Sequence, residues 1–228
     1  MHQQPNAYLR ICFVGRGRLG AFAKDYAYSE EDLIIFGFEG MGEVSYEKEL
    51  KGESDFFEEA ARLSKKAKGV VVCGCVTDTR GHKRKSAVVA ENGKLTGVSD
   101  MLNVIDGEVS CGGAIRVYET KLGRMGVVVA EDINFPDVVK ALSLCGSDFI
   151  VCPFGRVVNS LQQVLLRSYA YCYGIPIFFC GDGYCMIAEP SGMLAFSSPH
   201  SPITAEFENI REYHLIETRR RGFYCAEE

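Results

Sequence analysis

Residues 126–137 read Gly-Val-Val-Val-Ala-Glu-Asp-Ile-Asn-Phe-Pro-Asp, and the fold can be built outward from this stretch. The β-branched run within residues 125–130 predicts a buried strand. Pro136 favours the first turn of a helix, and Gly146 suits the point where that helix stops. The stretch therefore predicts a strand that leads through a short corner into a helix, a unit typical of α/β proteins.

Similar units extend from this stretch toward both ends of the chain. Ser54 is placed to cap a helix that runs to about Lys68, and residues 159–173 predict another helix, which Gly174 closes. Asn92-Gly93 lies between two apolar runs and is a strong signal for a β-hairpin. Further strands are predicted over residues 9–14, 33–38, 70–76, 86–90, 95–98, 114–118, 149–152, 176–180, 185–188, 193–196 and 203–207. Whether they form one sheet or two does not follow from periodicity.

The composition is that of an ordinary globular protein, with 228 residues of which 47% are hydrophobic and 24% charged. No linker-like stretch interrupts it, so we expect one domain over residues 1–228. The net charge of -5 argues against a nucleic-acid partner. No run approaches 18 apolar residues and the first residues lack a signal core, so we expect no membrane partner and a cytoplasmic location.

The ten cysteines lie mostly inside apolar runs and form no C-x-x-C pair. Cys73 and Cys75 are two residues apart, but no second pair of ligands follows at the spacing of a zinc site. These thiols therefore indicate reduced, buried side chains. We expect no metal and no cofactor.

One glycine motif indicates a different class of function. Gly15, Gly17 and Gly20 follow the strand predicted over residues 9–14, and Glu39 lies 19 residues beyond the last glycine. This spacing resembles a dinucleotide fingerprint, in which the glycines approach a pyrophosphate and the acid binds the ribose. The segment that follows leaves barely three turns for the required helix, so a plain turn is the simpler interpretation. A nucleotide-binding module stays open as an alternative.

Several blocks of the sequence, taken in order, resemble the nitrilase superfamily of carbon–nitrogen hydrolases. Residues 32–39 look like the strand that ends in the family's catalytic Glu, residues 86–97 like the hairpin before its Lys, and residues 126–137 like the elbow that carries its nucleophilic Cys. Residues 141–154, 167–180 and 186–192 resemble the family's later blocks. The order and spacing of these blocks cover about three quarters of the chain.

The resemblance implies a four-layer αββα sandwich of two mixed sheets flanked by helices, assembled as a homodimer through a helical face. It also implies a small amide- or nitrile-like ligand. In the family's chemistry a Cys thiolate attacks the amide or nitrile carbon and forms a covalent intermediate. A Glu transfers protons and a Lys stabilises the charge that develops on the tetrahedral centre.

The triad is degenerate when it is carried over position by position. Glu39 is present, although the alignment needs a one-residue slip and Phe38 stands where a Pro is usual. The Lys position falls on Met101 and the Cys position on Ala130. Methionine carries no positive charge, and alanine forms no covalent bond to substrate. A laboratory Cys-to-Ala substitution would also leave alanine at position 130, but it would leave the Lys in place at position 101.

These replacements favour a binding or regulatory protein over an enzyme that uses the usual cysteine mechanism. An amidase-type hydrolase with a relocated nucleophile, Cys180 or Cys185, stays open as the alternative. Glu131 and Asp132 adjoin Ala130 and could form an acidic pocket floor with Glu39. Clustered carboxylates raise each other's pKa, which suits acid–base work without a nucleophile.

Overall fold

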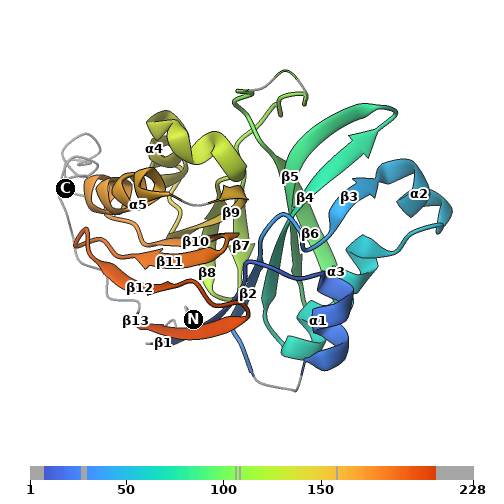
Figure 1. Ribbon diagram of the computed structural model, residues 1–228, viewed down its shortest axis with the longest axis horizontal. Coiled ribbons are helices and arrows are strands. Elements are labelled where there is room, and N and C mark those ends of the chain that lie inside the picture. Colours follow the sequence, from blue (N-terminus) through green and yellow to red (C-terminus); the bar gives the residue numbers. More distant parts are fainter. Residues whose placement is uncertain (1–7, 27–29, 106, 108, 158, 209–228) are drawn as a thin grey trace, which may run out of the picture.

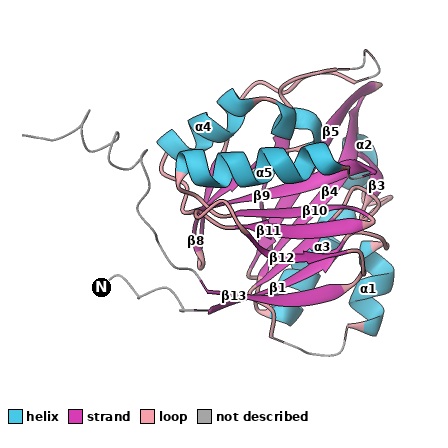
Figure 2. Cartoon of the chain, turned by 60° about the vertical axis from the view of Figure 1, so that its left-hand side comes forward, coloured by secondary structure: helices cyan, strands magenta, loops and turns pink. Residues whose placement is uncertain are grey.

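Two β-sheets lie face to face in the centre of the molecule, and helices cover their outer faces (Figure 1, Figure 2). The structure is a computed structural model that describes residues 8–26, 30–105, 107, 109–157 and 159–208. This arrangement is the predicted four-layer αββα sandwich, and it answers the open question in favour of two sheets. No helix in the described ranges is both long and apolar enough to cross a membrane.

The first sheet is mixed and has the strand order β13-β1-β2-β4-β5-β6, with β3 paired to β4. Its strands are β1 (Tyr8–Val14), β2 (Leu33–Phe36), β3 (Gly42–Ser45), β4 (Val70–Thr79), β5 (His82–Glu91), β6 (Lys94–Asp100) and β13 (Ile203–Glu208). Helices α1 (Leu19–Asp25), α2 (Tyr46–Lys51) and α3 (Phe56–Ala67) lie between these strands along the chain.

The second sheet has the order β12-β11-β10-β9-β8-β7. Its strands are β7 (Val117–Thr120), β8 (Gly123–Val127), β9 (Phe149–Val157), β10 (Ile177–Asp182), β11 (Tyr184–Ala188) and β12 (Leu194–Ser198). A 3₁₀ helix, η1 (Ala130–Asn134), leads into α4 (Pro136–Leu144), and α5 (Ser160–Tyr173) follows β9. Figure 2 shows α4 and α5 together on the outer face of this sheet.

Three apolar layers hold the four structural layers together, and the two-residue period of each strand decides which layer a side chain joins. On β1, Ile11 and Phe13 enter the core between the sheets, whereas Cys12 and Val14 face outward. The outward layer of the first sheet meets α1 and α3 through residues such as Leu63. The outward layer of the second sheet meets α4 and α5.

Most predicted elements are present. Asn92 and Gly93, with φ of 52° and 77°, form the two-residue turn between β5 and β6, as a primed hairpin turn requires. Pro136 begins α4 and Asn159 caps α5 through a capping box. The pattern missed the short elements β3 and α2, and it placed a strand at 114–118 that lies instead at Val117–Thr120.

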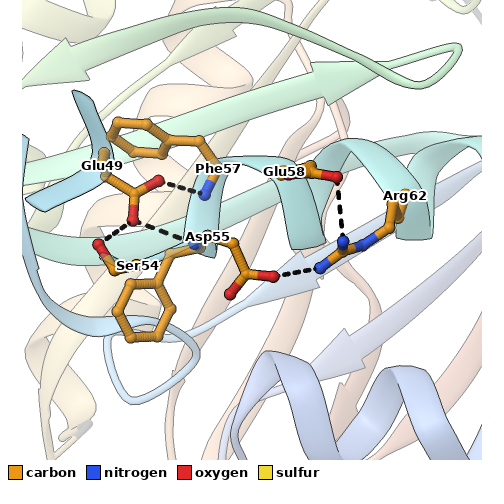
Figure 3. A network of polar contacts seen from close by, with 7 residues as sticks. Glu49, Ser54, Asp55, Phe57, Glu58 and Arg62 are labelled. Carbon is orange, nitrogen blue, oxygen red and sulfur yellow. Dashed lines mark hydrogen bonds and ion pairs between the residues drawn. The ribbon is translucent and has the colours of Figure 1, made fainter. Parts of the chain in front are cut away.

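The residue predicted to cap α3, Ser54, is wrong. Ser54 does not cap the helix; its hydroxyl donates to the carboxylate of Glu49, which lies on α2 (Figure 3). That carboxylate accepts the backbone N–H groups of Phe56 at 3.2 Å and Phe57 at 3.1 Å. A carboxylate from outside the helix therefore satisfies the first donors of α3.

Candidate functional site

Ala130 lies at a sharp corner between the second sheet and η1. The backbone N–H of Val128 still donates to Val151 of β9 at 3.0 Å, and two residues later Ala130 has φ of 51°. A left-handed backbone is unfavourable for any residue with a Cβ, and such strain gathers at functional sites. The chain thus keeps an elbow with residue 130 at its tip, where the fully buried side chain is a methyl group.

Met101 lies in the same core between the sheets as Ala130. Its N–H donates to the carbonyl of Lys85 at 2.8 Å, and its own carbonyl accepts from Gly112 at 2.7 Å. The side chain is 2% exposed and contributes no charge. The fold therefore places positions 101 and 130, to which the family resemblance assigns Lys and Cys, in the same core between the sheets.

Asp132 fastens the segment after β6 to the elbow. Its carboxylate accepts the backbone N–H groups of Leu102 at 2.8 Å and Asn103 at 2.9 Å, and the side-chain amide of Asn103 at 2.9 Å. Burial raises the pKa of Asp132 above its ordinary value, while these hydrogen bonds act in the opposite direction. With its acceptor oxygens used in this way, Asp132 acts as a positioning residue.

Glu131 places a buried carboxylate beside the elbow, and its partner is a lysine of the first sheet. Both carboxylate oxygens lie 2.7 Å from Nζ of Lys85 on β5. The Glu131 side chain is 3% exposed and that of Lys85 is 21% exposed. An ammonium group thus approaches the elbow from position 85, although none is present at position 101.

Glu39, the third predicted triad residue, does not join this group. It follows β2 in an exposed turn, whereas the preceding Phe38 packs on the core between the sheets. A Cβ at Gly74 would lie 2.6 Å from the Phe38 ring, and one at Gly155 would lie 3.1 Å from it. Two glycines, one in each sheet, therefore leave the space that the Phe38 ring fills.

Cys180 and Cys185 face each other across the hairpin of β10 and β11. Their sulfur atoms are 3.9 Å apart, and both side chains are buried in the core between the sheets. The hydrogen bond from Cys180 lowers the pKa of Cys185, while burial raises that of Cys180 well above its usual range. The pair therefore contains one thiol with a lowered pKa, and neither thiol is exposed.

Cys145 is solvent-exposed, and it lies at the other end of α4 from the elbow. The nine residues of that helix span about 13 Å at 1.5 Å per residue, so Cys145 lies away from the elbow.

Among the described residues, no group of three or more His, Cys, Asp or Glu side chains is arranged to hold a metal ion.

The glycine motif serves contacts within the chain. A Cβ at Gly15 would lie 2.5 Å from the carbonyl oxygen of Gly181, and one at Gly20 would lie 3.1 Å from the carboxylate of Glu59. Close approach to other parts of the protein accounts for these two glycines without a pyrophosphate. The helix that follows, α1, has only seven residues.

Sequence reasoning missed Lys85 and Phe38. Lys85 could have been found, because it shares the two-residue period of Ala87 and Val89, which face the core between the sheets. Because the run His82-Lys-Arg-Lys85 looks like a solvated hairpin tip, the inward-facing position of Lys85 was not recognised. Phe38 could not be placed in this way, because it lies beyond the end of β2, where the alternation of the strand stops.

Comparison with known proteins gives the same architecture. Residues 31–206 match the sequence profile of the carbon-nitrogen hydrolase family. A probable nitrilase of Schizosaccharomyces pombe is 26% identical over 129 residues, which are 53% of this chain and 47% of that protein. The aligned part of the chain thus spans about half the length of that relative.

Solved structures of low sequence identity share the fold. A cysteine-to-alanine mutant of the Nesterenkonia AN1 amidase superposes with a TM-score of 0.75 at 14% identity, over 99% of both chains. A carbon-nitrogen hydrolase of Helicobacter pylori G27 gives 0.73 at 16% identity, over 97% of this chain and 94% of that one. These superpositions show that the fold is shared. Because the profile match covers most of the sequence, the chain belongs to the carbon-nitrogen hydrolase family.

Proposed function

We propose that this chain is a binding or regulatory member of its family, which does not break C–N bonds through a cysteine nucleophile. The observation that carries the proposal is Ala130 at the tip of the elbow, with its methyl group in the position that the family resemblance assigns to Cys. A methyl group cannot form the covalent intermediate.

The other two triad positions support the same proposal. Met101 is buried and uncharged where the resemblance expects a Lys, and loss of one stabiliser of a developing oxyanion costs about 3–4 kcal/mol in the transition state. Glu39 is exposed, and the side chain that enters the core beside it is the apolar ring of Phe38. The two replacements and the exposed position of Glu39 thus each affect a different part of the chemistry.

A small amide- or nitrile-like molecule is the ligand class that we propose. A cysteine-to-alanine mutant of the Nesterenkonia amidase has been solved in complex with butyramide. That complex supports the idea that a member of this fold can hold an amide without a cysteine at the mutated position. We also propose that residues 1–228 work as one nitrilase-like domain in the cytoplasm.

The test is a turnover assay of the purified chain with aliphatic amides, nitriles and N-carbamoyl compounds. We expect no product above the uncatalysed background. Turnover that disappears in Glu39→Gln but persists in the neighbouring control Glu43→Gln would overturn the proposal, because it would restore Glu39 as a catalytic residue.

An active amidase with a relocated nucleophile is the second candidate, and one observation favours it: the lowered pKa of Cys185. Its burial argues against it, because substrate must reach the sulfur. Brief labelling with iodoacetamide and peptide mapping separates the two candidates. We expect the exposed Cys111, Cys145 and Cys172 to react before Cys185. Preferential labelling of Cys185, with an acyl adduct on it in the presence of an amide, would favour the second candidate.

We further propose a homodimer formed through the helices on the second sheet. The outward face of α5 carries a stripe of exposed apolar side chains, with Leu161 52%, Val164 59% and Tyr171 45% exposed, and Leu144 on α4 is 55% exposed. Several exposed apolar side chains on one helix face are a feature of interfaces. A second copy of the chain would cover it.

A further inference from the structure

Cys180 and Cys185 form a pair of thiols that the proposed function does not use. They are direct partners across the antiparallel strands β10 and β11, and their sulfur atoms are 3.9 Å apart. The Cα atoms of such partners lie about 4.5 or 5.5 Å apart, and both values fall within the range that a disulfide spans. The two sulfurs can therefore bond without a large movement of the backbone.

Cys185 is the thiol of this pair that ionises first. The hydrogen bond from Cys180 lowers its pKa, burial acts in the opposite direction, and hydrogen bonds from the backbone of Gly15 and Gly181 lower it further. Burial instead raises the pKa of Cys180 well above its usual range. Because the thiolate is the nucleophilic form of a cysteine, the two thiols differ in reactivity.

The glycine motif after β1 contributes to the surroundings of Cys185. A Cβ at Gly15 would lie 2.5 Å from the carbonyl oxygen of Gly181 and 3.4 Å from Sγ of Cys185. Because residue 15 has no side chain, its backbone comes close to the hairpin of β10 and β11. Gly15 thus contacts a thiol of the second sheet.

A surface ion pair spans the same junction between β1 and the hairpin. Arg16 directly follows Gly15 in the chain, and its Nε lies 2.5 Å from Oδ1 of Asp182. Asp182 in turn directly follows Gly181. Exposed ion pairs contribute little to stability, so this one can open without unfolding of the sheets.

We propose that Cys185 is a redox-modification site: a small two-electron oxidant such as hydrogen peroxide reaches it when the ion pair of Arg16 and Asp182 opens, and Cys180 then closes a reversible disulfide with it. The step uses no amide, so it is independent of the proposed function.

The oxidation proceeds in two displacements. The Cys185 thiolate attacks one peroxide oxygen and the O–O bond breaks; the released hydroxide takes up the proton that the thiol lost and becomes water, which leaves a sulfenic acid on Cys185. Cys180 then attacks the oxidised sulfur and the S–O bond breaks; the departing hydroxide takes the proton of Cys180 and becomes a second water. A small dithiol reverses the reaction by thiol–disulfide exchange.

The disulfide changes a contact between the two sheets. In the reduced form, Cys180 Sγ donates to the backbone carbonyl of Ile35 on β2 at 3.3 Å. A disulfide has no S–H group, so oxidation removes this donor from a buried carbonyl. Hydrogen exchange should therefore be faster in β2 and β10 of the oxidised chain than of the reduced chain. Equal protection in both forms would overturn this consequence.

The test treats the reduced, folded chain with hydrogen peroxide in the presence of a metal chelator, blocks the remaining thiols and maps the peptides without reduction. Proteolytic cleavage before Asp182 separates the two cysteines, so their bridge appears as two linked peptides. We expect this link in the wild type and its loss after treatment with dithiothreitol. In Cys180→Ala, Cys185 should stop at the sulfenic acid, which dimedone labels. The control Cys152→Ala, at a buried cysteine on β9, should form the link as the wild type does.

Arg16→Gln tests the route to the sulfur. The link should form about two- to fivefold faster in this variant, because the ion pair no longer holds the junction closed. Arg10→Gln, at an exposed position on β1, is the matched control and should keep the wild-type rate. A rate that Arg16→Gln does not raise would overturn the route.

The wild-type map decides the proposal even if a cysteine variant fails to fold. Oxidation confined to the exposed Cys111, Cys145 and Cys172 would overturn it. A link that joins Cys185 to a cysteine other than Cys180 would overturn it as well.

Discussion

Lys85 and Glu131 form an ion pair in which the carboxylate is almost completely withdrawn from water. Removal of one partner from such a pair leaves a buried charge without compensation, which is far more damaging than replacement of both partners. The pair links β5 of the first sheet to η1 beside the second, so its loss would act directly on the elbow.

We predict that Lys85→Met lowers the free energy of unfolding by about 3 kcal/mol, and that Lys85→Met combined with Glu131→Leu restores most of this loss. Urea unfolding measures both values. Lys83→Met is the matched control, because Lys83 lies two residues earlier on β5 and pairs with Glu43 at an exposed site; it should change stability by less than about 0.5 kcal/mol. Equal losses in the two lysine variants would contradict the role of burial.

Asp132 gives a prediction about pH. Burial holds its pKa above the ordinary value of 3.8, so the folded protein binds this proton more tightly than the unfolded chain does. The stability that this proton contributes is fully present below pH 3.8 and is lost as the pH rises through the folded-state pKa.

The variant Asp132→Asn cannot titrate at this position, so the stability of the wild type relative to the variant should fall as the pH rises from about 4 to about 7. Urea unfolding at several pH values measures the difference. Asp137→Asn, at the exposed start of α4, serves as the control. A stability difference that stays constant or grows with pH would show that burial is not the dominant influence on this carboxyl.

At the scale of elements, α3 depends on a residue outside itself. The carboxylate of Glu49 accepts two of the first backbone N–H groups of the helix, as Figure 3 shows for Phe57. We predict that Glu49→Ala lowers the free energy of unfolding by about 1 kcal/mol, the usual cost of a lost helix cap. Glu47→Ala on the same short helix, where the side chain is exposed, is the control; a similar loss there would point to α2 itself as the cause.

Elements with a local cause were predictable from the sequence. The hairpin at Asn92-Gly93, the start of α4 at Pro136 and the capping of α5 by Asn159 each depend on the conformational preference of one or two residues. The cap of α3 was not predictable in the same way. Ser54 is a good local candidate. The first backbone N–H groups of α3 instead donate to the carboxylate of Glu49, which the tertiary structure brings close from another helix.

At the scale of the whole molecule, the candidate site also combines features that the sequence predicts with features that only the tertiary structure determines. Positions 101 and 130 lie in the same core between the sheets, because each follows a strand whose partner is fixed by the fold. The inward turn of Phe38 depends on Gly74 and Gly155 in two different sheets, a coincidence of three distant segments. No local pattern encodes such an arrangement, and the Lys85–Glu131 pair has the same long-range origin.

The proposed dimer makes the last prediction. If the stripe on α5 meets a second copy, its central valine should be buried in the assembly, and Val164→Glu would place a charge in an apolar interface. We expect the wild type to sediment as a dimer and Val164→Glu to sediment as a monomer with unchanged secondary structure. Lys94→Glu, at the exposed β5–β6 turn of the other sheet, should remain dimeric. A monomeric wild type, or a dimer that tolerates Glu at position 164, would move the interface away from this face and leave the exposed apolar stripe to another partner.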